Sequence, residues 1–380
     1  MLPIHPQPKE DEIFSSWLVR LAFSNGFPLH TFYNTLLDYN GAVWTRDIDR
    51  HPSDALLQLI NVQTHQPVST LLEMTLRHYE GSFFSELPLH GDVSWLLPLG
   101  VFHRDRKRAG MQYCPLCMQN DSTPYYRLSW RNALTVICPK HHCVMEDRCP
   151  GCQSPVSFHR HGIGRQKVPY VEHLRHCHQC FLNLGDVSPR FPVWPDCESL
   201  NFLLALVSHA DLSPWRALGI ITPFSLPFFT GLRALLRLLN CRYGPRFENS
   251  FCHELGTPAL LPSTQDFEYL DSERRLILML RSCWLLQHWP DRFVECCRGA
   301  HLSRSRITEC PDLLPFWLET AIFPLDQRAY SPPDTEVFAA ACYLISQGQE
   351  VRWETLSEVL GVQRDWAKRL LRKVTLQNRS

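Results

Sequence analysis

The sequence lacks the features of several large classes of protein. No apolar run approaches the ~20 residues that cross a bilayer, because the best candidate, LILMLRSCWLL, is interrupted by Arg281. There is no Gly-Lys dipeptide, and hence no phosphate-binding P-loop, and neither HExxH nor GxSxG occurs. The N-terminus, MLPIHPQPKEDE, has neither the basic start nor the apolar core of a signal peptide. We therefore expect a soluble cytoplasmic protein that is not an enzyme.

The chain also lacks net charge, but its charges are unevenly distributed. The 38 basic and 38 acidic side chains cancel over the whole sequence. Residues 101–180 nevertheless carry 12 basic and 5 acidic side chains, including the run HRDRKR at 103–108, and residues 346–380 carry 7 and 4. Local basic surfaces favour a polyanionic partner.

Helical periodicity dominates both ends of the chain. Apolar residues recur at helical spacing over residues 10–24 and stop at Asn25-Gly26, and similar patterns follow to about residue 80 and again over 198–345. The sequence predicts a mainly α protein with five parts. These are an N-terminal helical domain (1–110), a zinc-binding region (111–185), a Pro-rich linker (186–197), a helical domain (198–345) and a helix-turn-helix (346–380). Residues 198–345 can be one domain or two.

Eight metal donors lie in the central region as four pairs, each with two residues between its members. The pairs are Cys114 and Cys117, Cys138 and His141, Cys149 and Cys152, and Cys177 and Cys180. Such a pair directs two donors at one ion, and structural zinc takes four donors in a tetrahedron. The spacing therefore predicts tandem zinc ribbons or knuckles that hold two structural Zn²⁺ ions. Sequential pairing gives one Cys₃His and one Cys₄ site, and a cross-brace arrangement is the alternative.

Other uses of these cysteines fit the pattern less well. Disulfides rarely persist in the cytoplasm, and a redox site would have a single reactive pair rather than four. Catalytic zinc leaves one position open to water, whereas both sets here are complete. A Pro-rich region of about 70 residues has too small a core to fold alone, so bound metal supplies the missing folding energy. His142 and Cys143 stand beside His141 and are possible substitutes for it.

The C-terminal sequence WETLSEVLGVQRDWAKRLLRKV fits a helix-turn-helix. Leu356, Val359 and Leu360 would face the core from a first helix, Gly361 would make the turn, and a second helix would follow. Its outward residues are candidates for contacts with nucleic acid: Gln363, Arg364, Lys368, Arg369, Arg372 and Lys373. The alternative is an amphipathic helix whose basic face contacts protein.

The first half of the sequence resembles the TniQ/TnsD family of transposition target selectors. The resemblance begins with a P-x-x-D-E-x-x-x-S-W-L-x-R-L-A-x-x-N-G pattern that starts at Pro8 and ends at Gly26. It continues through YCPLC, an aromatic stretch containing Trp130, CPKH and CPGC. It covers roughly residues 1–181.

The resemblance implies a bacterial accessory protein of transposition, associated with the nucleoid, that is not itself the transposase. Family members link target recognition to an AAA+ ATPase regulator, which recruits the transposase. Some, often homodimers, ride on an RNA-guided CRISPR effector (Cascade), and others bind an attachment site directly. The length of this chain suits the Cascade adaptor, whereas its C-terminal motif suits direct sequence-specific DNA binding.

Overall fold

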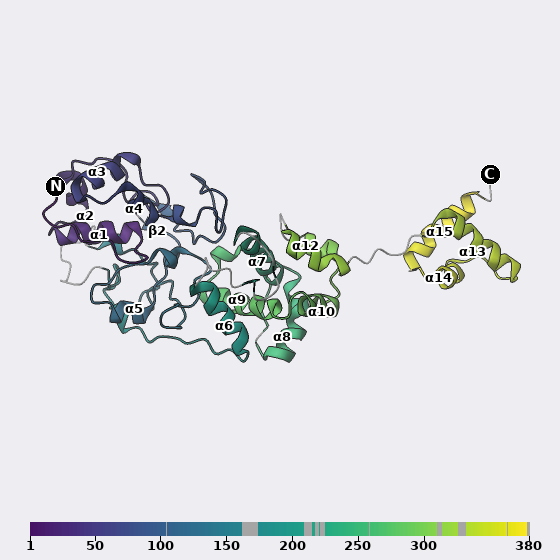
Figure 1. The fold of residues 1–380 in the computed structure, drawn as a ribbon. Helices are drawn as coiled ribbons and strands as arrows, with labels where there is room; N and C mark the ends of the chain where they lie inside the picture. Colours follow the sequence, from purple (N-terminus) through teal and green to yellow (C-terminus); the bar gives the residue numbers. More distant parts are fainter. Residues whose placement is uncertain are drawn as a thin grey trace. The chain divides into compact units, whose positions relative to one another are not determined.

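The chain divides into two compact units. The computed structural model describes residues 1–103, 105–161, 174–208, 215–216, 220, 225–257, 259–309, 314–325, 332–362 and 364–377. For His30, Asp365 and residues 373–377 it describes the backbone alone. Unit 1 comprises Met1–Leu302 and Arg306–Ile322, and unit 2 comprises Ser303–Ser305 and Phe323–Ser380. Figure 1 shows the ribbon of both units.

Helices account for most of the described secondary structure, which confirms the mainly α prediction. In unit 1 they are α1 (Phe14–Ser24), α2 (Leu29–Thr31), α3 (Asp54–Thr64), α4 (Val68–Glu73), α5 (Pro115–Asn120), α6 (Cys197–Ser208), α7 (Ser225–Asn240), α8 (Glu248–Leu255), α9 (Ser272–Leu286), α10 (Asp291–Gly299) and α12 (Phe316–Ile322). The short α11 (Arg304–Thr308) lies where the units meet in sequence. Unit 2 contains α13 (Asp334–Ser346), α14 (Trp353–Leu360) and α15 (Arg364–Gln377). No described helix has the length and apolar character needed to span a membrane.

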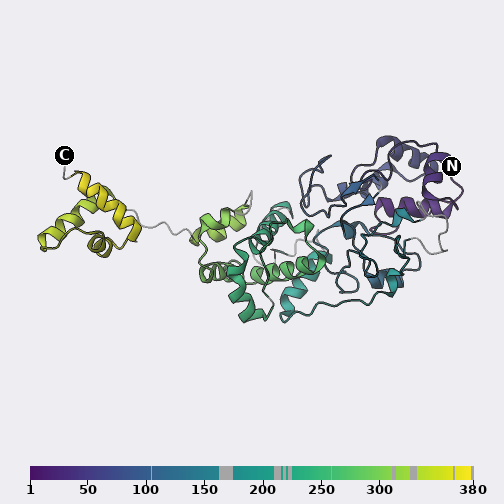
Figure 2. The same ribbon diagram turned by 180° about the vertical axis from the view of Figure 1, so that it is seen from behind.

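Shorter elements complete the described fold. A π-helical turn covers Phe32–Leu36, and short 3-10 helices cover Leu76–Tyr79, Leu128–Arg131, Phe158–Arg160, Leu184–Asp186, Gly244–Phe247, Phe267–Tyr269 and Phe323–Leu325. Two strands, β1 (Val101–Phe102) and β2 (Asp105–Arg106), form an antiparallel hairpin with Val101 opposite Arg106. The described residues between α4 and α6, labelled in Figure 1 and seen from behind in Figure 2, are mostly irregular apart from the short α5.

The first helix is the anchor of the N-terminal part of unit 1. The helical pattern begins near residue 10, but the helix begins one turn later, at Phe14. Glu10 and Asp11 form a turn in which Asp11 has a φ of 54°, and Ile13 is extended. Phe14, Trp17 and Leu18 are fully buried. The helix ends as expected at Asn25, and Gly26 follows with a φ of 75°, a conformation that glycine adopts without steric cost.

Residues of the family pattern fasten α1 to the cysteine-rich region. Glu12 is completely buried and pairs with Arg20 at 2.6 Å. Glu12 also accepts a hydrogen bond from Ser16, whose hydroxyl oxygen accepts one from the backbone N–H of Tyr126. The backbone N–H of Ile13 in turn donates to the carbonyl of Tyr126. This polar network satisfies groups that burial would otherwise leave unpaired.

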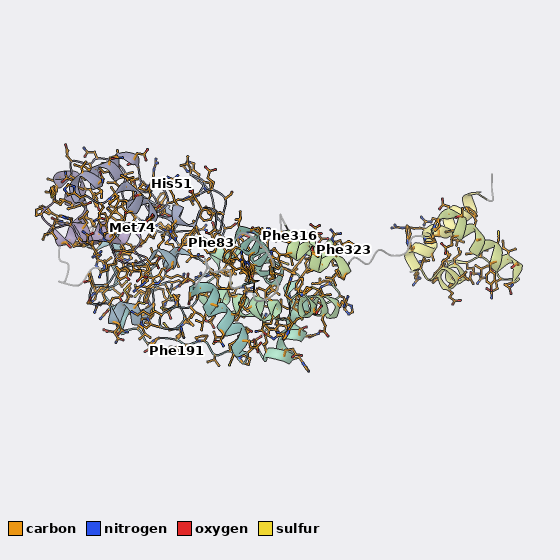
Figure 3. All side chains as sticks on the ribbon, viewed as in Figure 1. His51, Met74, Phe83, Phe191, Phe316 and Phe323 are labelled. Carbon is orange, nitrogen blue, oxygen red and sulfur yellow. The ribbon has the colours of Figure 1, made fainter. Side chains whose placement is uncertain are left out.

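The later helices of unit 1 build a second apolar core that is continuous with the first. Phe83, labelled in Figure 3, lies 4.4 Å from Phe229 of α7 between ring centroids. Trp95 packs against the same Phe229, and its backbone N–H donates to the buried carboxylate of Glu268. The cores before and after the cysteine-rich region therefore belong to one compact unit.

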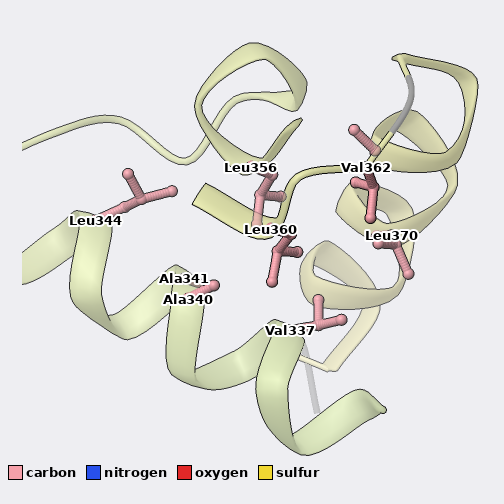
Figure 4. Packing of buried hydrophobic residues seen from close by; sticks show 9 residues of the cluster. Val337, Ala340, Ala341, Leu344, Leu356, Leu360, Val362 and Leu370 are labelled. Atoms are coloured by element: carbon pink, nitrogen blue, oxygen red, sulfur yellow. The ribbon is translucent and has the colours of Figure 1, made fainter. Parts of the chain in front are cut away.

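Unit 2 contains a small three-helix core. Its buried residues are Val337, Ala340, Ala341, Leu344, Leu356, Leu360, Val362, Ala367 and Leu370 (Figure 4). Gly361 ends α14 in the left-handed conformation at a φ of 62°. The hydroxyl of Ser357 then donates to the carbonyl of Val362 across the turn. Val359 was expected in the core but is 44% exposed, because α14 directs Leu356 and Leu360, one turn apart, at α13 and α15.

Candidate metal centres and nucleic-acid interface

The first four predicted donors converge on one point of unit 1. Cys114 caps the N-terminus of α5, where its sulfur accepts a hydrogen bond from the backbone N–H of Cys117. Cys138 and His141 lie on a turn whose flanking residues, Ile137 and Val144, pair as an antiparallel bridge. The four ligand atoms all lie within 4.8 Å of one another, and the three cysteines are buried. We call this set centre 1.

The distances within centre 1 fit a tetrahedral ion. Bonds of about 2.3 Å to sulfur and 2.0 Å to nitrogen would place two sulfurs about 3.8 Å apart, and a sulfur and a nitrogen about 3.5 Å apart. The sulfurs of Cys117 and Cys138 lie 3.8 Å apart. The Nδ1 atom of His141 lies 3.4, 3.3 and 3.7 Å from the sulfurs of Cys114, Cys117 and Cys138. These separations are too long for disulfide bonds, and the cysteines are free.

The remaining four donors form centre 2, which consists of Cys149, Cys152, Cys177 and Cys180. Their sulfurs also lie within 4.8 Å of one another, with 3.5 Å between Cys149 and Cys180 and 3.6 Å between Cys152 and Cys177. The two centres thus have the sequential pairing rather than the cross-brace. Centre 2 is less enclosed than centre 1, since Cys180 is exposed and Cys152 half-buried.

Three of the four donor pairs are built on the same backbone turn. The turns begin at Cys138, Cys149 and Cys177. In each, the N–H of the first cysteine donates to the carbonyl five residues later, and the N–H four residues later donates back to the cysteine carbonyl, at 2.8–3.0 Å. An antiparallel bridge flanks each turn. The pair Cys114 and Cys117 differs, because it uses the start of a helix.

The shared turn places a non-glycine residue in the left-handed region each time. These residues are His142, Gln153 and Phe181, with φ values of 54°, 59° and 62°. Residues with a Cβ avoid this conformation, so their side chains give no sequence signal for it. The spacing within each pair predicted a tight turn, but nothing in the sequence indicated which residue adopts the left-handed conformation.

The three thiols of centre 1 shift one another's pKa through hydrogen bonds. Hydrogen bonds from the thiols of Cys114 and Cys117 lower the pKa of Cys138 to about 2. Hydrogen bonding with Cys114 and Cys138 raises the pKa of Cys117 well above that of a free thiol. One thiolate is therefore stabilised by its neighbours' protons, and a bound metal ion would take the place of those protons. Four donors from the protein complete the coordination of such an ion.

A fifth sulfur lies beside centre 1. Cys143, a possible substitute for His141, is fully buried, and its sulfur lies 3.4 Å from that of Cys114. His142, the other possible substitute, is exposed on the turn. The structure thus places His141 among the four donors and Cys143 next to them. The sequence spacing alone did not show which of the two residues is the donor.

The predicted nucleic-acid residues lie on α15, or next to it, in unit 2. Arg364, Arg369 and Arg372 are exposed, whereas Lys368 is half-buried. The guanidinium of Arg364 and the amine of Lys368 lie 4.8 and 5.4 Å from the ring centre of Trp353 on α14. Gln363 and the side chain of Lys373 fall outside the described residues. Two helices joined by a turn are present, but DNA binding by them stays a prediction.

Trp353 is a residue whose importance the sequence pattern did not reveal. It lies at the start of α14 and is half-buried, with the two cations of α15 over its ring. Such cation–π contacts fix the direction of long basic side chains and stabilise them modestly. In the sequence, the only sign of this role is an aromatic residue at the start of the helix that precedes the basic helix.

A comparison with family models identifies the N-terminal part of the chain. The TniQ model matches residues 3–145. The match includes α1 with its buried Glu12 and all four donors of centre 1, and it ends before centre 2. No curated protein matches the chain in sequence. Residues 3–145 of this chain are thus a TniQ domain.

Proposed function

We propose that this protein is a transposition target-selection adaptor. The observation that carries the proposal is the TniQ domain over residues 3–145, which fits a transposition-associated protein. In the proposed role, the chain links a DNA-recognition event, supplied by an RNA-guided Cascade effector, to an AAA+ regulator and the transposase. It acts in the bacterial cytoplasm at the nucleoid, as a monomer or a homodimer.

The two centres support a structural role for metal in this adaptor. Both donor sets are rich in thiolate, which favours zinc over magnesium or calcium. Centre 1 and centre 2 each offer four donors, the number that a tetrahedral zinc ion takes. Zinc held in this way stabilises the fold of the region, and we propose that the protein has no catalytic activity of its own.

A second candidate function is direct recognition of an attachment site. It is favoured by the exposed Arg364, Arg369 and Arg372 on α15, which follows the turn at Gly361. Arginines near the N-terminus of a recognition helix can bind guanine bidentately, and later ones can bind phosphate. In this candidate function, unit 2 supplies the sequence preference.

Binding of the zinc-loaded full chain to a genomic DNA library over a range of salt concentrations distinguishes the two. The adaptor should bind weakly, lose affinity steeply with salt and retain no sequence selectively. Retention of one sequence, with relaxed preference in Arg364→Gln, would favour the direct reader. A reconstituted transposition reaction provides the second arm. If omitting the chain leaves the choice of target unchanged, both candidate functions are wrong.

A further inference from the structure

The basic run at 103–108, of which the structure describes all residues but 104, begins in the β1–β2 hairpin and ends just after it. The proposed function gives this run no role. The hairpin carries an aromatic ring, Phe102, that is 62% exposed. The ring of His103 meets that of Phe102 edge-on at 4.5 Å. The amine of Lys107 lies 6.0 Å from the centre of the Phe102 ring. An exposed aromatic side chain beside a cation therefore marks this hairpin.

The charges of the run divide into an inward and an outward set. Arg106 is buried, and burial lowers its pKa even though the nearby carboxylate of Asp47 acts in the opposite direction. Asp105 pairs with Arg160 and with Lys107. Lys107 and Arg108 are exposed. Arg106 thus helps to hold the hairpin in place, whereas Lys107 and Arg108 form a basic surface.

Two hollows flank this hairpin in unit 1. The larger, of about 610 Å³, reaches from Arg46 and His51 to Arg108, and His51 is labelled in Figure 3. The smaller, of about 520 Å³, reaches from Lys107 to Asp271. Both are lined by Pro98, Arg108 and Tyr269. Arg108 lies over the ring of Tyr269 at 4.1 Å and separates the hollows.

The acidic groups of the larger hollow are already engaged. Asp47 pairs with the buried Arg131 at 2.7 Å. Asp92 accepts a hydrogen bond from Tyr269, and burial together with this bond raises the pKa of Tyr269 to about 12. By contrast, the side chains of Arg46 and His90 are exposed and have no hydrogen bond or ion pair with a described residue. The uncompensated charge in this hollow is therefore positive.

We infer that the hairpin and its two hollows bind single-stranded nucleic acid. Arg46, Lys107 and Arg108 would contact phosphates, and Phe102 would stack on an unpaired base. A cationic groove combined with an exposed aromatic platform is the arrangement by which proteins bind single strands without sequence preference. The inference goes beyond the proposed function, because it gives unit 1 its own nucleic-acid site, whatever α15 binds.

An acidic peptide is the competing ligand, and the geometry favours nucleic acid over it. A peptide carboxylate would use the cations but has no need of an exposed ring beside them. The exposed cations span two hollows, which suits a chain with one phosphate per nucleotide. Unstacked bases are available in single strands and not in a duplex, so Phe102 adds affinity for single strands alone.

The test compares fluorescent dT20 with a duplex of the same length, using the full chain and measuring anisotropy over a salt series. Phe102→Ala should weaken dT20 binding about tenfold and leave the duplex unaffected. Phe191→Ala, which removes another exposed ring of unit 1, is the matched control and should change neither. The triple variant Arg46→Gln, Lys107→Gln, Arg108→Gln should reduce the slope of log affinity against log salt by about 2, at about 0.7 per contact. Arg298→Gln removes one charge from an exposed arginine of α10, away from the hairpin in sequence, and should leave the slope unchanged.

Three results would overturn the inference. The first is wild-type affinity and salt slope in both hairpin variants, given unchanged metal content and circular dichroism. The second is loss of dT20 binding in Arg364→Gln, Arg369→Gln with none in the hairpin variants, which would move the site to unit 2. The third is hairpin-dependent binding of a Glu-rich peptide without any binding of dT20. Because the binding measurement needs no transposition partner, its result can be interpreted even if the proposed adaptor role is wrong.

Discussion

At the scale of single residues, the eight metal donors carry the clearest consequence. Each centre has four donors and no spare within its own set, so removing one leaves three. We predict that Cys177→Ser lowers the metal content from two ions to one and unfolds the region around residues 145–181. The expected loss of stability is on the order of 4 kcal/mol, as for loss of a structural metal.

The matched control for that variant is Cys197→Ser, at an exposed cysteine outside both centres. It should retain two ions and wild-type stability. Metal analysis and amide hydrogen exchange of peptides from residues 145–161 and 174–181 measure both effects. A Cys177→Ser protein with two ions and normal protection would rule out centre 2 as assigned.

A buried carboxyl group gives a pH-dependent prediction. Burial, reinforced by the neighbouring charge of Asp47, raises the pKa of Asp49 from 3.8 to about 6. Between about pH 4 and 6 the folded state therefore binds a proton that the unfolded state does not. The stabilisation from this proton is complete below about pH 4 and is lost as the pH rises through 6.

Comparison with Asp49→Asn isolates this effect, since both proteins contain the same metal centres. As the pH falls from 7 to 4, the free energy of unfolding of the wild type should rise relative to that of the variant by up to about 3 kcal/mol. Urea denaturation at several pH values measures the difference. If the difference in the free energy of unfolding stays constant, or decreases as the pH falls, the pairing of Asp49 with Arg131 outweighs the effect of burial.

At the scale of elements, the three repeated metal turns were only half predictable. The spacing of the donors predicted tight turns and two complete centres. The left-handed residues His142, Gln153 and Phe181 had no glycine to signal them. The turns hold because each has two backbone hydrogen bonds and a flanking bridge. Local hydrogen bonding thus overrides the preference of single residues for negative φ.

Glycine should relieve this strain. Gln153→Gly is expected to be more stable than Gln153→Ala by about 1 kcal/mol, because only glycine adopts a φ near 59° without a clash of its Cβ. Both variants lose the same side-chain hydrogen bond to the carbonyl of Pro150, so the comparison isolates the backbone. Thermal unfolding of the two metal-loaded variants measures it. Equal stability, or a more stable alanine variant, would mean that the turn carries no such strain.

The packing of α1 in unit 1 depends on the ion pair between Glu12 and Arg20. Glu12→Ala would leave Arg20, whose side chain is 10% exposed, without its carboxylate, and should destabilise unit 1 by about 3–5 kcal/mol. The exposed Glu10 provides the control, and Glu10→Ala should have little effect. Denaturation monitored by tryptophan fluorescence is suitable, because Trp17 and Trp130 are buried in this region. Equal stability of the two variants would contradict a stabilising role for the Glu12–Arg20 pair.

Over the whole molecule, the sequence predicted the type of secondary structure in each region better than the boundaries of the helices and of the compact units. The helical periodicity over residues 198–345 is confirmed by helices such as α7 and α9, whose apolar residues are buried in a large core. The helical pattern that was expected up to about residue 80 is less regular at residues 29–36, where the three residues of α2 are followed by a π-helical turn. The division of the chain after Ile322 had no signal in composition, since helical patterns continue on both sides of it.

The candidate metal sites were predictable because ligands obey fixed spacing, whereas contacts between distant segments do not. Nothing in the sequence joined Glu12 to Ser16 and Tyr126, or placed Arg108 between two hollows. These contacts depend on how helices and loops pack, which local patterns do not encode. The nucleic-acid surface of α15 stays a prediction for the same reason.

We propose that two four-donor centres, one within the TniQ domain and one after it in the sequence, hold structural zinc. Native mass spectrometry of the purified full chain, with elemental analysis of the same sample, tests it most directly. We expect two zinc ions per chain, and release of both as acid protonates the thiolates. A folded chain with no metal, or with one ion bound outside Cys114, Cys117, Cys138 and His141 and outside the four cysteines of centre 2, would contradict it.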